Sequence, residues 1–259
     1  MAKYNRQVVF VHIPKTAGLS LHYALLRSLG EDDCLRVGNL EKYNALFSIS
    51  EVELRKKKYI GGHLFFNEIY DRLGSDPLYF TVFRDPVARC ISAFHYVNSF
   101  SGHPAHADFL KMTFGDYLRR ESETIRSMMC RQISGYSTAV EAFAVFKEMY
   151  WDGVNVEEVD ELGHAISAYL NMPISVGVYN VTSGFAKIML TGDDLDLLHE
   201  LTREDRKLVA MFSDPLGQLH RATRRSASSL LAIAAHASKS AGSAKKRNAR
   251  PRPGRRKTI

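Results

Sequence analysis

The residues best suited to chemistry follow the first apolar run of the chain, Val8 to Ile13. In order they are Pro14, Lys15, Thr16, Ala17, Gly18, Leu19 and Ser20. A strand that ends in such a loop before a helix surrounds an anion with backbone N–H groups, because the first amides of a helix lack intrahelical partners and the dipole is positive there. Lys15 adds a point charge, Thr16 and Ser20 add hydroxyl donors, and Gly18 lets the backbone come close. The pattern predicts a phosphate-binding loop.

The loop does not form a Walker A motif, in which the lysine follows the glycines. Here Lys15 precedes the single glycine, and no segment supplies a clear magnesium-binding carboxylate. A nucleotide kinase is therefore disfavoured, and dependence on ATP and magnesium would reveal one.

A second group of polar residues follows the apolar run Tyr79 to Phe83. Arg84 comes first and offers a planar fork to a phosphate. Ser92 lies eight residues later, about two helical turns, so its hydroxyl is predicted to address the same ligand. Asp85 and Pro86 suit the start of the intervening helix, and Arg89 has the spacing of an ion pair with Asp85.

Histidine is the usual base near neutral pH, and the chain has ten. His63 ends a short apolar run, and ligands of parallel sheets bind beyond the carboxyl ends of strands. It is interpreted either as a general base or as a positioning residue. His12 is expected to pack, and His95 follows Arg84 on the same helix. His103 and His106 share a loop, but no second cluster supports a metal there, so no metal site is predicted.

The segment from His12 to Ser20 resembles the 5′-phosphosulfate loop of sulfotransferases that use 3′-phosphoadenosine 5′-phosphosulfate (PAPS). It is most similar to the branch with heparan sulfate 2-O-sulfotransferases and their bacterial relatives. Arg84 and Ser92 match the arginine and serine of that family's 3′-phosphate motif. The resemblance is strong from Val8 to Val97 and faint from there to Ala222; within the faint part, Arg131 to Gly135 looks like a later family helix.

The resemblance implies that PAPS binds Pro14, Lys15, Thr16, Ala17, Gly18, Leu19, Ser20, Arg84 and Ser92. It also implies that His63 is the catalytic base and that Lys15 stabilises charge on the bridging oxygen as the bond breaks. The acceptor would be a hydroxyl, expected on a carbohydrate such as a glycan or glycolipid. This scheme requires no metal.

Apolar runs alternate with helical spacing, so the fold class is predicted as α/β: a three-layer sandwich with a central parallel sheet and a P-loop-like phosphosulfate-binding loop. Strands are expected at Gln7 to Ile13, Tyr59 to His63, Tyr79 to Phe83 and Ser175 to Tyr179. Helices are expected at residues 20–29, 86–97, 109–118, 123–133, 157–170 and 203–211, with another starting near Pro215.

The net charge of +7 is unevenly distributed. Twelve of the 35 basic residues and none of the 28 acidic ones follow Leu219, so the rest of the chain is acidic overall. We therefore expect a sulfotransferase domain at residues 1–222 and a basic, largely disordered tail at residues 223–259. The alternative function is an inactive nucleotide-binding fold that binds polyanions, such as nucleic acid or anionic lipid, weakly through this tail.

The three cysteines, Cys34, Cys90 and Cys130, have no disulfide or zinc spacing and suit a reducing compartment. The chain also shows neither a signal peptide nor a membrane span, so a cytoplasmic location is expected. Nothing in the sequence specifies an oligomeric state.

Overall fold

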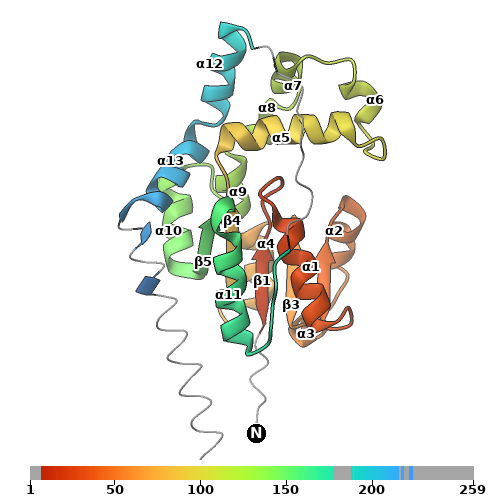
Figure 1. Ribbon diagram of the computed structural model, residues 1–259, viewed down its shortest axis with the longest axis vertical. Coiled ribbons are helices and arrows are strands. Elements are labelled where there is room, and N and C mark those ends of the chain that lie inside the picture. Colours follow the sequence, from red (N-terminus) through yellow and green to blue (C-terminus); the bar gives the residue numbers. More distant parts are fainter. Residues whose placement is uncertain (1–6, 178–187, 189, 216, 219–221, 224–259) are drawn as a thin grey trace, which may run out of the picture.

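The computed structural model describes residues 7–177, 188, 190–215, 217–218 and 222–223 (Figure 1). Within these residues lies one five-stranded sheet in the order β2-β3-β1-β4-β5, in which every neighbouring pair is parallel. The strands are β1 (Val8–Val11), β2 (Cys34–Val37), β3 (Tyr59–Gly62), β4 (Leu78–Phe83) and β5 (Tyr150–Asn155).

Helices cover both faces of the sheet, which confirms the predicted three-layer α/β class. One face packs against α1 (Gly18–Leu29) and α11 (Val159–Leu170). The other face packs against α4 (Phe66–Leu73), α9 (Met128–Ser134), α10 (Ala139–Met149) and α13 (Arg203–Ser213). Residues of β1 alternate between the two cores, because successive side chains of a strand point to opposite faces. Since both faces of β1 are buried, every residue of the strand has to be apolar.

A third apolar cluster lies beyond the carboxyl edge of the sheet, under the helices at the top of Figure 1. It joins α5 (Pro86–Ser99), α6 (His106–Phe109), α7 (Phe114–Arg120), α8 (Ser122–Ile125) and α12 (Gly192–Leu201). Helix α5 thus leaves β4 and lies over the end of the sheet where ligands of such folds bind.

Three short elements complete the described part of the chain. They are α2 (Leu40–Leu46), α3 (Glu51–Lys56) and the 3-10 turn η1 (Val156–Glu158).

The structure corrects the predicted strands at three places. Ser175–Gly177 has no strand structure, and Val178 and Tyr179 lie outside the described residues. The sheet edge is instead β5, whose Asp152 and Gly153 interrupt its apolar pattern, and β2 joins at the opposite edge. Three strands were predicted correctly: β1 and β4 are largely apolar, and β3 is a short run that ends in two glycines.

Two predicted helices are also divided. The helix expected at 123–133 breaks at Ser127, which has a φ of 50° and precedes α9. The one expected at 109–118 is interrupted before Thr113, whose hydroxyl accepts from the Asp116 amide and starts α7. Such caps override helical spacing because they satisfy amides that the helix leaves free. The predicted helices at 20–29, 86–97 and 203–211 are confirmed as α1, α5 and α13, and helical residues begin again at Pro215.

Candidate active site at the carboxyl edge of the sheet

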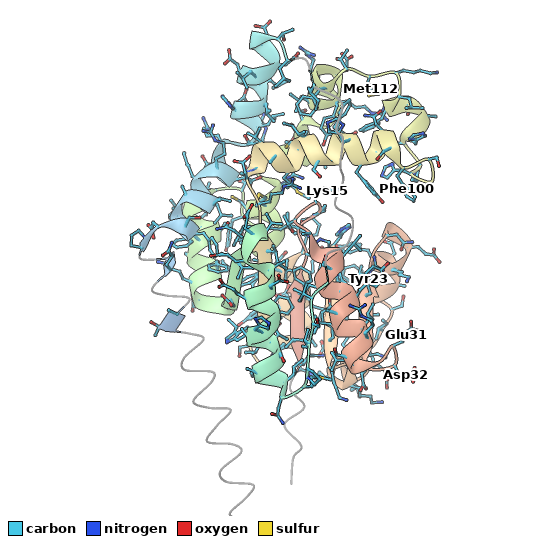
Figure 2. All side chains as sticks on the ribbon, viewed as in Figure 1. Lys15, Tyr23, Glu31, Asp32, Phe100 and Met112 are labelled. Carbon is cyan, nitrogen blue, oxygen red and sulfur yellow. The ribbon has the colours of Figure 1, made fainter. Side chains whose placement is uncertain are left out.

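Three neighbouring strands bring the predicted site residues to one edge of the sheet. Strand β1 lies between β3 and β4. His63 directly follows β3, the loop from Pro14 follows β1, and Arg84 directly follows β4. Because parallel strands end at the same edge, segments far apart in sequence meet here, with Lys15 below α5 in Figure 2.

The loop has the backbone of an anion cradle. Lys15 and Ala17 have φ values of 73° and 58°, in the left-handed region that non-glycine residues seldom enter. No side chain caps α1, and its first turn has no acidic residue. Alternating left-handed residues before an uncapped helix expose amides toward one point, as in anion-binding nests.

The loop hydroxyls differ in what they offer. Thr16 is fully buried, and its hydroxyl donates to the carbonyl of Ile13 at 2.8 Å. This bond closes the turn, so the Thr16 hydroxyl proton is used within the loop in this structure. Ser20 is also buried, with 5% of its surface exposed.

Three side chains from elsewhere in the chain hold the ends of the loop. Gln132 of α9 donates to the His12 carbonyl at 2.8 Å, and Thr81 of β4 donates to the Val11 carbonyl at 2.8 Å. Arg84 donates from Nη1 to the Lys15 carbonyl at 3.0 Å. Sequence reasoning missed Gln132, since nothing in the residues around it indicates that α9 reaches β1.

The site is rich in positive charge. None of the ion pairs found between described residues involves Lys15, Arg36 or Arg84. Burial, and then the nearby charge of Arg84, lowers the pKa of Lys15. Its Nζ lies 4.0 Å from the centre of the Tyr96 ring on α5. Uncompensated cations around a nest are suited to a ligand with several negative charges.

Three histidines gather beside the loop. The His12 ring centre lies 5.1 Å from that of His63 and 5.2 Å from that of His22. His22 Nδ1 is hydrogen-bonded to the Tyr59 hydroxyl, and both residues are buried. His12 also stacks on Phe10 at 5.1 Å, so it packs as predicted.

The glycines of this region are explained by close approaches. A Cβ on Gly18 would lie 2.2 Å from the His12 ring. Gly62 has a φ of 147°, and its Cβ would lie 1.9 Å from the Val37 carbonyl oxygen. Both positions therefore exclude side chains, and Gly62 lets His63 leave β3 beside β2.

The three histidines are held neutral. Burial comes first among the causes that lower the pKa of His12 and His22, in His22 to about 3. Burial, then Arg36, then Lys15 lower the pKa of His63 to about 4. The His63 side chain is nevertheless solvent-exposed, so water screens part of the effect of those two charges. A neutral, exposed imidazole is able to accept a proton.

The residues that follow β4 divide into two groups. Asp85 caps α5 as predicted, accepting from the Ala88 amide at 2.7 Å, and Pro86 occupies the first turn. Arg84 is partly exposed, whereas Ser92, two turns into α5, is 6% exposed. No described bond joins these two side chains, so their common ligand remains a prediction.

Arg89 does not take the predicted partner. Instead of Asp85, it faces the interior, where its Nη2 lies 3.2 Å from Cys90 Sγ and its Nε is buried without a hydrogen bond. Its charge reaches the buried Asp205, whose carboxylate accepts from the Met129 and Cys130 amides. Burial raises the pKa of Asp205, while these amides and Arg89 oppose the rise. Arg89 is therefore part of the interior and not of the exposed edge.

Three further histidines in the described part of the chain lie on or near α5 and α6. His103 Nδ1 accepts from the Ala105 amide at 3.2 Å, and His106 Nδ1 lies 2.8 Å from the Val97 carbonyl oxygen. His95 is partly buried, which lowers its pKa. Across the described residues there is no group of three or more His, Cys, Asp or Glu side chains that suits a metal ion.

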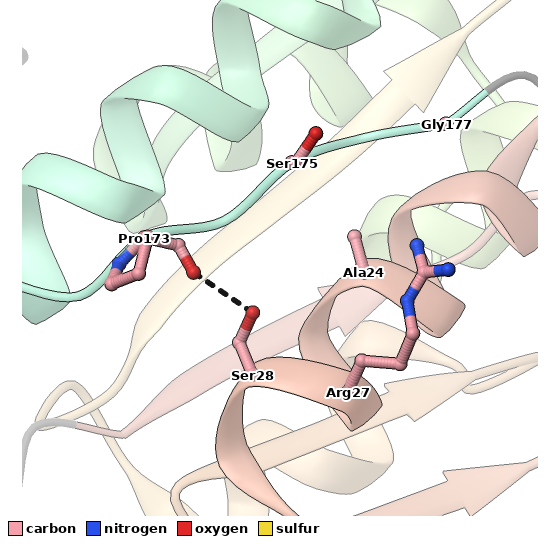
Figure 3. A pocket seen from close by; sticks show the side chains of 6 residues that line it. All are labelled: Ala24, Arg27, Ser28, Pro173, Ser175 and Gly177. Carbon is pink, nitrogen blue, oxygen red and sulfur yellow. Dashed lines mark hydrogen bonds between the residues drawn. The ribbon is translucent and has the colours of Figure 1, made fainter.

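An open pocket of about 420 Å³ lies elsewhere along α1 (Figure 3). It is lined by Ala24, Arg27, Ser28, Pro173, Ser175 and Gly177. Ser28 donates to the Pro173 carbonyl at 2.9 Å and ties this segment to α1. Ala24 lies six residues beyond the start of α1, roughly 9 Å along its axis, so the pocket is separate from the loop.

No helix in the described ranges combines the length and apolarity needed to cross a bilayer. Residues 224–259, most of the predicted tail, lie outside the described part.

Comparison with known proteins gives several structural matches. No family model matches the chain, and no curated protein does. The solved structure of a mouse sulfotransferase, SULT7A1, complexed with PAP matches with a TM-score of 0.45 and 15% sequence identity. The match covers 86% of this chain and 89% of that one.

Proposed function

We propose that this protein is a sulfotransferase that moves a sulfuryl group from PAPS to a hydroxyl of a carbohydrate acceptor. One observation carries the proposal: the loop, Arg84 and His63 follow the adjacent strands β1, β4 and β3. An anion cradle, a phosphate-binding fork and a neutral imidazole therefore share one edge of the sheet.

The donor would bind across β1 and β4. Its 5′-phosphosulfate would accept bonds from the amides between Lys15 and Ser20, where α1 has neither a cap nor an acid. Its 3′-phosphate would meet Arg84 and Ser92. Ser92 is largely buried, so only a small part of its surface is open to a phosphate.

The transfer needs one proton acceptor and one cation. The acceptor oxygen attacks sulfur while its proton passes to His63, and the bond between sulfur and the bridging phosphate oxygen breaks. Lys15 lies in the loop and would stabilise the charge that develops on that oxygen. Adenosine 3′,5′-bisphosphate leaves as the second product, and the atoms balance without a metal ion.

The acceptor would enter from the side of β3 and β2, where His63 is exposed. A glycan or glycolipid hydroxyl fits this proposal, which takes residues 1–222 as the catalytic domain and residues 223–259 as an accessory tail.

The decisive experiment is transfer of labelled sulfate from PAPS to a panel of glycans, glycolipids, alcohols and phenols. We expect transfer to at least one hydroxyl acceptor, with none in Arg84→Ala. Failure of the protein to bind adenosine 3′,5′-bisphosphate would contradict the proposed function.

Removal of the residues after Ser226 separates the proposal from the polyanion-binding alternative. Unchanged transfer with lost polyanion binding makes the tail an accessory. Polyanion binding without any transfer in the full chain favours the alternative.

A further inference from the structure

Tyr96 contacts Lys15 in a way that the phosphate-binding pattern does not require. Its ring lies on α5, one turn beyond Ser92, and receives the Lys15 ammonium at 4.0 Å. The face of an aromatic ring carries the negative part of its quadrupole and attracts a cation within about 6 Å. Among the contacts between described residues, the Tyr96 ring is the group that attracts the Lys15 ammonium.

The contact opposes two unfavourable effects on Lys15. The ammonium is partly withdrawn from water, and Arg84 brings a like charge, and both lower the pKa of Lys15. A long flexible side chain in this position would gain by turning outward to solvent. The attraction to the Tyr96 ring favours the inward position of the Lys15 side chain.

The Tyr96 ring is itself held in place. Phe100 stacks on it with ring centres 5.4 Å apart and an interplanar angle of 25°. His103 meets it edge-on at 6.1 Å, and the His103 amide donates to the Phe100 carbonyl at 2.9 Å. The turn after α5 thus fixes the ring, although 41% of Tyr96 is exposed.

We propose that Tyr96 is a positioning residue, which holds the Lys15 ammonium over the loop so that it meets the phosphosulfate of the donor. This rests on the proposed function, because Lys15 is taken as the residue that stabilises the leaving oxygen. Tyr96 acts through Lys15 and does not itself have to contact the reacting atoms.

A first experiment tests the contact without any ligand. Protons of a lysine methylene that lies over a ring are shifted upfield by the ring current, so NMR of the free protein detects the arrangement. We expect an upfield-shifted Lys15 signal in the wild type and in Tyr96→Phe, and its loss in Tyr96→Leu. A wild-type Lys15 signal at the ordinary lysine position overturns the inference, whatever the protein does with PAPS.

A second experiment tests the consequence through binding of adenosine 3′,5′-bisphosphate by calorimetry. Tyr96→Leu is expected to bind roughly threefold to tenfold more weakly, and Tyr96→Phe to bind as the wild type does. In a Lys15→Gln background, Tyr96→Leu should have no further effect, because the two residues act as one unit.

The control is Tyr136→Leu, which removes another exposed tyrosine that has no described contact with Lys15. It should bind like the wild type. Equal binding by Tyr96→Leu and the wild type, or an additive effect in the Lys15→Gln background, overturns the inference. A wild type that does not bind the nucleotide contradicts the proposed function instead, while the ring-current result still decides the contact.

Discussion

Arg84 donates from Nη1 to the Lys15 carbonyl at 3.0 Å across 69 positions of sequence. The bond fastens the end of β4 to the loop after β1, so the two halves of the proposed donor site are joined before a donor binds. Only one of the five N–H donors of the guanidinium is used in this bond, which leaves others for a phosphate.

Replacing Arg84 with alanine should therefore remove both a phosphate ligand and a brace of the loop. We expect binding of adenosine 3′,5′-bisphosphate to weaken by roughly 100-fold or more, because charge-assisted bonds are among the strongest polar contacts. Arg84→Lys should rescue little, since lysine lacks the planar fork. Calorimetry measures both variants, with the exposed Arg27→Ala as the control for lost charge. Tight binding by Arg84→Ala would show that the 3′-phosphate lies elsewhere.

His63→Asn should lose catalysis but keep donor binding. A general base contributes about 100-fold to 10,000-fold, so kcat should fall by that factor. The nucleotide affinity should stay within about twofold, because His63 follows β3, on the other side of β1 from β4. His164→Asn changes an exposed histidine on α11 and serves as the control. Full activity of His63→Asn would assign His63 a structural role.

The pH dependence of activity should reflect the positive charges around His63. In the proposed mechanism the neutral imidazole of His63 is the active form, so we expect activity to be lost as pH falls through its pKa. Protein burial, Arg36 and Lys15 lower that pKa, which places the acidic limb of kcat/KM below the ordinary histidine value. Arg36→Gln removes the larger of the two charge contributions and should move the limb to higher pH, whereas Arg27→Gln should leave it in place. An unmoved limb in Arg36→Gln would mean that another group titrates.

Gly18→Ala should destabilise the fold and the loop together. The new methyl would lie 2.2 Å from the buried His12 ring, which itself packs against Phe10 and His63. We expect a loss of about 1–3 kcal/mol in unfolding free energy by urea denaturation, with weaker nucleotide binding. Gly192→Ala at the start of α12 meets no atom within 4 Å and should stay within about 0.5 kcal/mol of the wild type. Equal stability of the two variants would contradict the close packing of His12 on Gly18.

The sequence predicts the parts of the fold that carry continuous apolar runs. Strands β1 and β4 are largely of this kind, β3 is a short run that ends in Gly61 and Gly62, and the site residues follow the ends of all three. Strand β5 escapes prediction because Asp152 and Gly153 break its pattern, and β2 because it is short and contains Arg36. The edge position of β2 is set by its pairing with β3, which the local sequence does not reveal.

The candidate site divides in the same way. Lys15, Arg84 and His63 are predictable because loop motifs carry their residue types in fixed order. Gln132 and Tyr96 are not, because each reaches the loop from a helix whose placement depends on packing. A sequence motif thus identifies the residues proposed to contact the ligand. It does not identify the residues from other helices that hold those residues in position.

The bond from Gln132 to the His12 carbonyl has a consequence for synthesis of the chain. Helix α9, which carries Gln132, is in turn capped at its amides by Asp205 of α13. A growing chain that has left the ribosome only through α5 already contains Lys15, His63 and Arg84, yet it lacks the helices that fix the start of the loop. Competence to hold the nucleotide should therefore arise late, after residue 205 has emerged, and fragments that end earlier should leave the edge of the sheet open to chaperones.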